Sequence, residues 1–172
     1  MKAGTIYFYT ATIFNWKQLL QVNERKEVIL NSLQYLVEEK AAKVYAYVIM
    51  PNHIHLLWKP LETEKYQNVQ LSFMRFTAQK LLFQLHDSDR HIDDFLVDKK
   101  DRNYQIWQRN PLAVEMYSRK LIEQKLDYIH NNPVQGKWML AKSPIDYEYS
   151  SAQFYESEDM THPFLTHYMD DI

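Results

Sequence analysis

The stretch KVYAYVIMPNHIHLLWK, residues 43–59, decides most of the predicted fold. The runs at 43–50 and 53–59 are rich in β-branched and aromatic side chains, which favour β-strands. Pro51 and Asn52, which separate the two runs, are typical turn residues. Because the break is only two residues long, we expect the two strands to pair as an antiparallel hairpin.

Further elements are expected on both sides of this hairpin, from strand composition and helical spacing of apolar residues. The chain should begin with a strand at 5–14 and a helix at 23–40, and the hairpin should be followed by a helix with apolar positions from Leu71 to Leu85, a flexible charged loop at 87–103, a fourth strand at 104–109 and a helix at 114–131. The last helix should end at Asn132, because the residue before a proline disfavours helical dihedrals.

The first six elements follow the split β-α-β order of ferredoxin-like folds. The sequence therefore predicts an α+β fold, ferredoxin-like or RRM-like, in which an antiparallel sheet carries helices on one face.

The composition of the 172 residues restricts the possible classes of function. Hydrophobic residues make up 46% and charged residues 24%, which is typical of one folded domain. The chain has two glycines and no cysteine. Glycine-rich dinucleotide and phosphate loops are therefore excluded, as are disulfides, thiolate metal sites and a cysteine nucleophile. We expect a cytoplasmic protein, because no stretch is typical of a signal peptide or a membrane helix.

Charge divides the chain into two parts, although the net charge is only −2. Residues 1–140 contain 19 lysines and arginines against 15 acids, whereas residues 141–172 contain one lysine and seven acids. We predict a mildly basic domain at 1–140 with an acidic C-terminal extension at 141–172, packed on it or trailing from it. A basic body suits a nucleic-acid partner, but an acidic solvated tail on an ordinary domain explains the charge equally well.

His53 and His55 begin the second strand of the hairpin. Side chains alternate along a strand, so both imidazoles should point to one face while Ile54 points to the core. Two neighbouring imidazoles make half of a metal site. They could instead be ordinary surface histidines, and a zinc site would need a third histidine or a carboxylate.

Tyr128 stands out because of its neighbours on the last predicted helix. Lys125 and Asn132 share its face of the helix, whereas Leu126 and Ile129 belong to the apolar stripe. A phenol is a weak nucleophile at neutral pH and needs an electrophile polarised by a cation. The amide oxygen of Asn132 could complete a two-histidine metal site beside Tyr128. With 13 tyrosines in the chain, ordinary packing is the alternative role.

These residues carry a resemblance to a known family. MPNHIHLL, residues 50–57, resembles the His-hydrophobic-His (HUH) motif of the single-tyrosine transposases. KLDYIHNNPV, residues 125–134, resembles their tyrosine helix as found in the REP-associated tyrosine transposase branch. IWQR at 106–109 and YSSA at 149–152 also match recurring segments of that branch, so the resemblance covers about residues 4–155.

The resemblance implies an activity and a set of site residues. The family cleaves and rejoins single-stranded DNA in a metal-dependent reaction, through a 5′-phosphotyrosine intermediate, during DNA transposition. Tyr128 corresponds to the nucleophile, and His53, His55 and Asn132 correspond to the ligands of Mg²⁺ or Mn²⁺. The expected partner is single-stranded DNA folded into a hairpin, and a homodimer is possible.

Basic side chains near these motifs are candidate phosphate contacts, with a solvated helix face as the alternative. These candidates are Lys125, Arg109, Arg119 and Lys120. Aromatic residues could stack on bases, although core packing is the alternative for most of them. The aromatic candidates are Tyr7, Tyr9, Tyr45, Tyr47 and Trp58.

Two other functions remain open at this point. A non-catalytic module could grip single strands on an RRM-like sheet, and it would not need the histidines and Tyr128 to converge. A metal-dependent phosphoesterase that uses water as nucleophile would tolerate the loss of Tyr128.

Overall fold

The computed structural model describes residues 1–61, 63, 68–87, 92–157 and 162–172. Its strands are β1 Tyr7–Thr12, β2 Ala42–Met50, β3 His53–Pro60, β4 Leu96–Lys99, β5 Arg102–Tyr104 and β6 Leu112–Glu115. Its α-helices are α1 Asn23–Glu38, α2 Val69–Asp87, α3 Arg119–Asn131 and α4 Ala152–Ser157.

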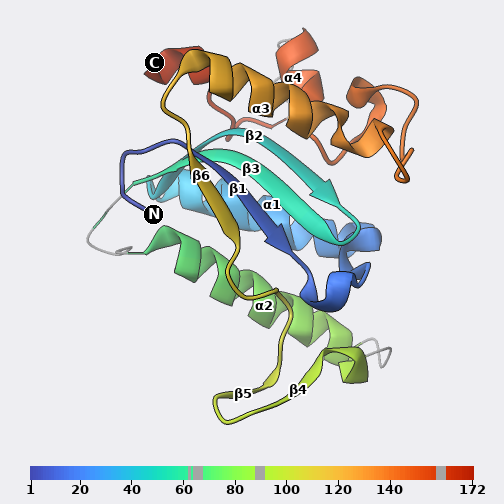
Figure 1. The fold of residues 1–172 in the computed structure, drawn as a ribbon. Coiled ribbons are helices and arrows are strands. Elements are labelled where there is room, and N and C mark those ends of the chain that lie inside the picture. The colour runs from blue at the N-terminus through green and yellow to red at the C-terminus, as the bar shows by residue number, and fades with distance from the viewer. Residues whose placement is uncertain (62, 64–67, 88–91, 158–161) are drawn as a thin grey trace.

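Four strands form one antiparallel sheet in the order β2-β3-β1-β6. Helices α1 and α2 lie together on one face of this sheet, and α3 lies over the opposite face (Figure 1). The predicted α+β ferredoxin-like fold is confirmed, with α1 and α2 on one face as expected. The position of α3 adds a third layer, so both faces of the central strands are covered.

The register of β1 and β3 decides which side chains face which layer. Thr10 pairs with His55, and Thr12 pairs with His53. Because side chains alternate along each strand, Trp58 faces α2, where its ring centroid lies 5.8 Å from that of Phe73. His53 and His55 face α3 instead.

Helix α3 begins at Arg119 because Ser118 caps it. The Ser118 side chain accepts a hydrogen bond from the backbone N–H of Leu121, which satisfies a donor that the first turn leaves free. Ile122 and Ile129 are buried beneath the helix. This amphipathic face packs α3 onto β2 and β3.

The predicted fourth strand at 104–109 is wrong, and so is the predicted helix start at residue 114. The fourth strand of the main sheet is instead β6, in which Val114 pairs with Phe8. Residues 112–118 can satisfy either a helical or an extended pattern locally. The free edge of β1 decides the outcome, because pairing there supplies backbone hydrogen bonds along the whole strand.

The charged segment 87–103, expected to be an irregular loop, contains regular structure where it is described. Residues 92–95 form a 3₁₀ turn, and β4 and β5 form a small antiparallel hairpin. The expected loop is therefore wrong for this part, because cross-strand pairing compensates for the weak local pattern. Residues 88–91 lie outside the described residues.

The described residues of the acidic segment 141–172 run along the open edge of β2. Ser150 bridges Val48, and Leu165 bridges Val44. An uncovered edge strand would present free backbone groups to other chains. The C-terminal segment satisfies part of that edge.

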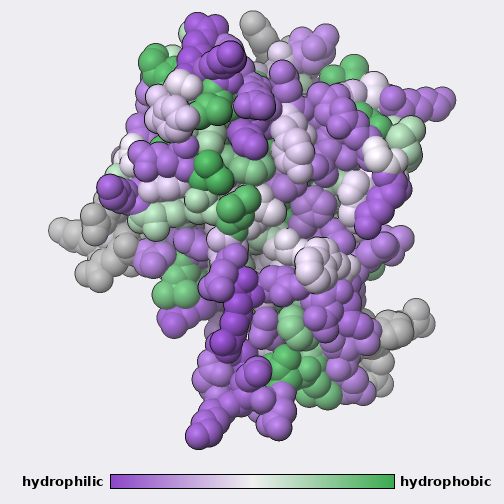
Figure 2. Space-filling model, viewed as in Figure 1, coloured by the Kyte–Doolittle hydropathy of each residue, from purple (hydrophilic) through white to green (hydrophobic). Residues whose placement is uncertain are grey.

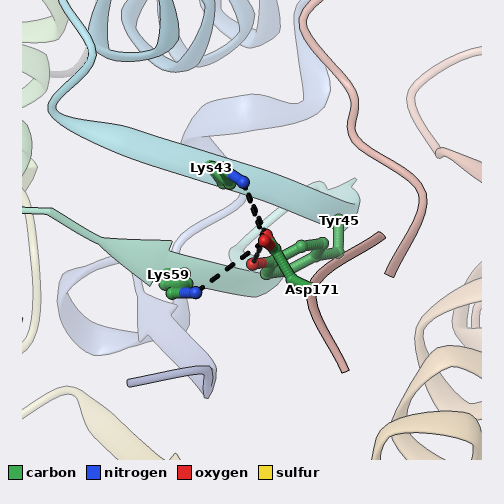
Figure 3. Close-up of polar contacts among 4 residues, drawn as sticks. All are labelled: Lys43, Tyr45, Lys59 and Asp171. Atoms are coloured by element: carbon green, nitrogen blue, oxygen red, sulfur yellow. Dashed lines mark hydrogen bonds and ion pairs between the residues drawn. The ribbon is translucent and has the colours of Figure 1, made fainter. Parts of the chain in front are cut away.

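The last 3₁₀ turn, Tyr168–Asp171, is fastened to the sheet by its terminal acid (Figure 3). Asp171 accepts a hydrogen bond of 2.7 Å from the Tyr45 hydroxyl and pairs with Lys43 at 2.8 Å and Lys59 at 3.9 Å. These contacts lower the pKa of the Asp171 carboxyl, chiefly through the hydrogen bond from Lys43. The turn therefore ties the chain end to β2 and β3.

Among the helices of the described residues, none combines the length and the apolar composition that a membrane crossing requires.

Candidate active site

The two histidines of β3 lie side by side under α3. Their ring centroids are 4.7 Å apart, and Ile54 between them is fully buried on the opposite face, as the alternation predicted. His55 is 5% exposed, so the pair is not an ordinary surface feature. Burial of a polar ring without hydrogen-bond partners costs free energy, so buried imidazoles are expected to have partners.

Each ring is held through its Nδ1 atom. The Thr10 hydroxyl lies 2.7 Å from Nδ1 of His55, and the Asn52 amide oxygen lies 2.7 Å from Nδ1 of His53. The Asn52 amide nitrogen donates to the Trp16 carbonyl, which points the amide oxygen at His53. Nδ1 of His53 therefore carries the proton, and Nε2 presents a lone pair. Such outer partners orient the ligands of a metal.

Both imidazoles are neutral at neutral pH. Burial lowers the pKa of His53 to about 4, with Lys137 contributing and the Asn132 side chain opposing. Burial lowers the pKa of His55 to about 3, with smaller contributions from His53 and Lys125. A neutral imidazole is the form that binds a metal ion, so the environment keeps the pair ready for one.

Tyr128 comes from α3 and lies against His55. Its ring centroid is 5.1 Å from that of His55 and 5.8 Å from that of Phe8. Phe8 also stacks on His55 at 5.3 Å. Tyr128 is 47% exposed, so its phenol can be reached from solvent.

Asn132 follows α3 immediately, at the start of the 3₁₀ turn Asn132–Val134. Its Oδ1 atom is buried and has no hydrogen-bond partner in the described structure, and the same holds for Nε2 of His55. Buried polar atoms are normally satisfied. A cation would satisfy the Asn132 oxygen, and it would satisfy Nε2 of His55 in the tautomer whose Nδ1–H donates to the Thr10 hydroxyl, so the residues fit a metal site.

The donor set indicates the type of cation. Two imidazole nitrogens and an amide oxygen form a mixed donor set, which differs from the oxygen ligands that Mg²⁺ prefers. No group of three or more histidines and carboxylates occurs within the described residues. The zinc alternative therefore lacks the third ligand it would need.

Two lysines and a tryptophan border the site. The Lys125 ammonium lies 4.6 Å from the Phe8 ring centroid and 5.5 Å from that of Tyr128. The Trp138 ring lies 5.9 Å from His53, and the Lys137 ammonium lies 5.1 Å from the Trp138 ring. These groups place positive charge and a half-buried aromatic surface beside the histidines.

Helix α3 is anchored on its other side by His130. Nε2 of His130 lies 2.9 Å from the Ser151 hydroxyl, which in turn accepts from the Tyr47 backbone N–H at 3.0 Å. Burial lowers the pKa of His130 to about 4. Because residues 128 and 130 project to opposite sides of a helix, this anchor fixes the rotation that turns Tyr128 toward His55.

The structure does not bring the remaining predicted DNA contacts to the histidines. Arg119, at the far end of α3, pairs with Glu123 at 2.7 Å, and Lys120 is exposed nearby. Arg109 lines a groove beside α2. The aromatic candidates for base stacking are packed in the core instead, namely Tyr7, Tyr9, Tyr45, Tyr47 and Trp58.

The sequence analysis missed several residues of this site: Phe8, Thr10, Lys137 and Trp138. Asn52 was identified only as a turn residue. Strand pairing of β1 with β3 places Thr10 opposite His55, and no local pattern signals such a contact. Asn52 could have been found, because a side chain that immediately precedes the motif is well placed to orient it.

Comparisons with known proteins concern the fold. No family model and no curated protein matches the chain. A REP-associated tyrosine transposase, solved bound to a REP hairpin, matches with a TM-score of 0.60 and 19% identity over 96% of this chain and 84% of its own. A candidate transposase from Deinococcus radiodurans R1 matches with a TM-score of 0.43 and 19% identity over 76% of this chain and 97% of its own. The first comparison shows a shared fold along almost the whole chain.

Proposed function

We propose that this protein is a transposase-like enzyme that cleaves and rejoins single-stranded DNA, with Tyr128 as the nucleophile. The observation that carries the proposal is the position of Tyr128, whose ring lies 5.1 Å from that of His55, near two buried polar atoms that lack a hydrogen-bond partner, Nε2 of His55 and Oδ1 of Asn132. A shared fold alone would not indicate an activity. The sequence motifs and the convergence of these residues support it together.

The proposed reaction replaces one phosphate ester by another. The Tyr128 oxygen forms a bond to the phosphorus of a DNA phosphodiester while the bond to the 3′ oxygen breaks. The phenol proton leaves to water, and the departing 3′ oxygen takes up a proton. The products are a 5′-phosphotyrosine and a free 3′-hydroxyl. Attack by a second 3′-hydroxyl on the phosphotyrosine reverses the step and joins DNA ends.

His53, His55 and Asn132 are the residues that would hold the divalent cation, Mn²⁺ or Mg²⁺. When bound, the cation supplies positive charge to a phosphate oxygen, which makes the phosphorus more electrophilic. Thr10 and Asn52 orient the imidazoles, and Lys125 adds a second positive charge beside the phenol. Phe8 excludes water from one side of His55.

We further propose that the DNA partner folds into a hairpin, like the DNA bound by the structural neighbour. All four proposed site residues belong to one chain, so a homodimer would add a second site rather than complete the first. We also propose that the protein acts in the cytoplasm, in association with the nucleoid if the cell is bacterial.

Replacement of Tyr128 by phenylalanine tests the proposal. Tyr128→Phe should abolish the SDS-resistant adduct that the wild type forms with single-stranded DNA in Mn²⁺, because only the attacking oxygen is lost. Tyr117→Phe is the matched control, since Tyr117 is 83% exposed just before α3 and should keep the adduct.

Each other outcome identifies a rival function. An adduct formed by Tyr128→Phe would mean that another group attacks. Metal-dependent cleavage without any adduct would indicate a phosphoesterase that uses water. DNA binding without cleavage by the wild type would indicate a binding module.

A further inference from the structure

A groove of about 830 Å³ runs between α2 and the segment 101–111, on the side of the molecule away from α3. Three arginines line it: Arg75 from α2, Arg102 from β5 and Arg109 from the chain that leads into β6. Much of the remaining polar lining consists of amide side chains, namely Asn68, Gln70, Gln79, Gln105, Gln108 and Asn110.

The groove carries an excess of positive charge. Asp101 is the single acid in its lining, and it pairs with Arg102. Arg75 and Arg109 form no ion pair with any described residue, and both are exposed. The hydrogen bond from Arg102 makes the largest contribution to lowering the pKa of the Asp101 carboxyl, and the charge of Arg109 makes a smaller one. Neither Arg75 nor Arg109 is held in an ion pair within the described residues, and guanidinium groups match phosphate in a bidentate manner.

One wall of the groove is fastened to the rest of the fold at Trp107. The Trp107 indole N–H donates a buried hydrogen bond of 3.0 Å to the Thr77 hydroxyl of α2. Trp107 also bridges Ile13 at the end of β1. These contacts join Trp107 to both α2 and the sheet, so this part of the groove is already in place before a ligand binds.

The groove also begins close to the candidate active site. The Gln108 backbone N–H donates to the Thr12 carbonyl at 2.7 Å, and Thr12 is the β1 partner of His53. One strand therefore separates the histidines from the segment that carries Arg109. Figure 2 shows hydrophilic side chains gathered over the lower part of β6 and the segment that leads into it.

We propose that this groove binds the phosphate backbone of single-stranded DNA that flanks the cleaved phosphate. The proposal rests on the proposed function and adds a second contact region to it. Arg75 and Arg109 contact phosphates, and the amide side chains can hydrogen-bond base edges. Arg109 would then contact a phosphate other than the reacting one. This agrees with its position in the groove beside α2, because Tyr128 lies on α3 at the other face of the sheet.

The test compares long and short DNA probes. The probes are two pools of fluorescein-labelled single-stranded DNA of mixed sequence, about 40 and about 8 nucleotides long. Strands of the long pool can reach from the active site into the groove, whereas strands of the short pool cover one binding site. Arg75→Gln/Arg109→Gln should weaken binding of the long pool about tenfold and reduce the slope of log affinity against log salt by about 1 to 2. Binding of the short pool, and its adduct with Tyr128, should stay unchanged.

Lys40→Gln/Lys142→Gln is the matched control, because it removes two exposed charges that do not line the groove. Circular dichroism checks the fold of each variant, and Arg75→Gln alone provides a milder change. Unchanged affinity and salt slope for the long pool would overturn the groove assignment while the wild-type adduct still supported the proposed function. Absence of both binding and adduct in the wild type would overturn the two proposals together.

Discussion

The two faces of the central sheet are built from alternate residues of the same strands, yet their chemistry differs. Toward α1 and α2, Tyr9, Trp58 and Phe73 pack ring against ring in a fully buried layer. Toward α3, His55 and its neighbours form a half-buried polar layer. Buried polar atoms without a hydrogen-bond partner occur on both faces, at Tyr9 and Trp58 on one and at His55 and Asn132 on the other. The difference between the faces is therefore one of side-chain type, because large aromatic rings fill the layer under α1 and α2 whereas imidazole, amide and hydroxyl groups gather under α3.

This division makes the free energy of unfolding a direct probe of each face. Substitutions in the layer under α1 and α2 should lower the free energy of unfolding strongly, because they remove buried apolar surface and leave cavities. Substitutions among the site residues should cost little stability and should affect the reaction instead.

Phe73→Ala should lower the free energy of unfolding by about 3–5 kcal/mol, because it leaves a cavity next to Trp58. Phe83→Ala on the same helix is the control, since Phe83 is 71% exposed and its loss should cost less than about 0.5 kcal/mol. Urea denaturation of both variants measures the difference. Equal losses would contradict the assignment of α2's inner face as the stabilising layer.

Acid should destabilise the protein through the buried histidines on the α3 side. The folded-state pKa values of His53, His55 and His130 are lowered to about 4, about 3 and about 4, whereas the unfolded chain binds protons near pH 6.5. The unfolded state therefore binds more protons below that pH, so stability is fully present above about pH 7 and falls as the pH decreases toward 4.

Urea denaturation at pH 7 and pH 5, with a chelator present, measures this loss. His55→Leu lacks one of the three imidazoles and should lose less stability between the two pH values than the wild type. Carboxylates contribute equally to both proteins, so they cancel in the comparison. An identical loss in the two proteins would contradict the lowered pKa of His55.

Ser151→Ala should cost about 1–3 kcal/mol, because it leaves the His130 imidazole and the Tyr47 N–H without their buried partner. The rate of adduct formation should fall as well, since α3 loses the contact that sets its rotation. Single-turnover adduct formation measures the rate. An unchanged rate in a destabilised variant would mean that Ser151 stabilises α3 without positioning Tyr128.

His55→Leu should change the free energy of unfolding at pH 7 by less than about 1 kcal/mol, because His55 already leaves one nitrogen unsatisfied. The same variant should lose the Mn²⁺-dependent adduct completely. Urea denaturation and the adduct assay, run on one preparation, test both parts. A large loss of stability would show that His55 belongs to the structural layer after all.

Local patterns predicted the parts of the fold that depend on neighbouring residues. Alternation in residues 53–55 placed both imidazoles on one face, and helical spacing placed Lys125, Tyr128 and Asn132 together. The fourth strand could not be predicted in this way, because residues 112–115 extend only when the free edge of β1 is beside them. The same limit hid the hairpin of β4 and β5.

The sequence by itself determined which side chains share a strand face or a helix face, because these relations follow from the periods of 2 and 3.6 residues. Only the tertiary structure decided that the two faces meet, that Thr10 and Asn52 hold the imidazoles, and that Arg109 lies in a separate groove. Such contacts depend on strand register and helix packing, which join residues far apart in the chain. Local periodicity contains no information about them.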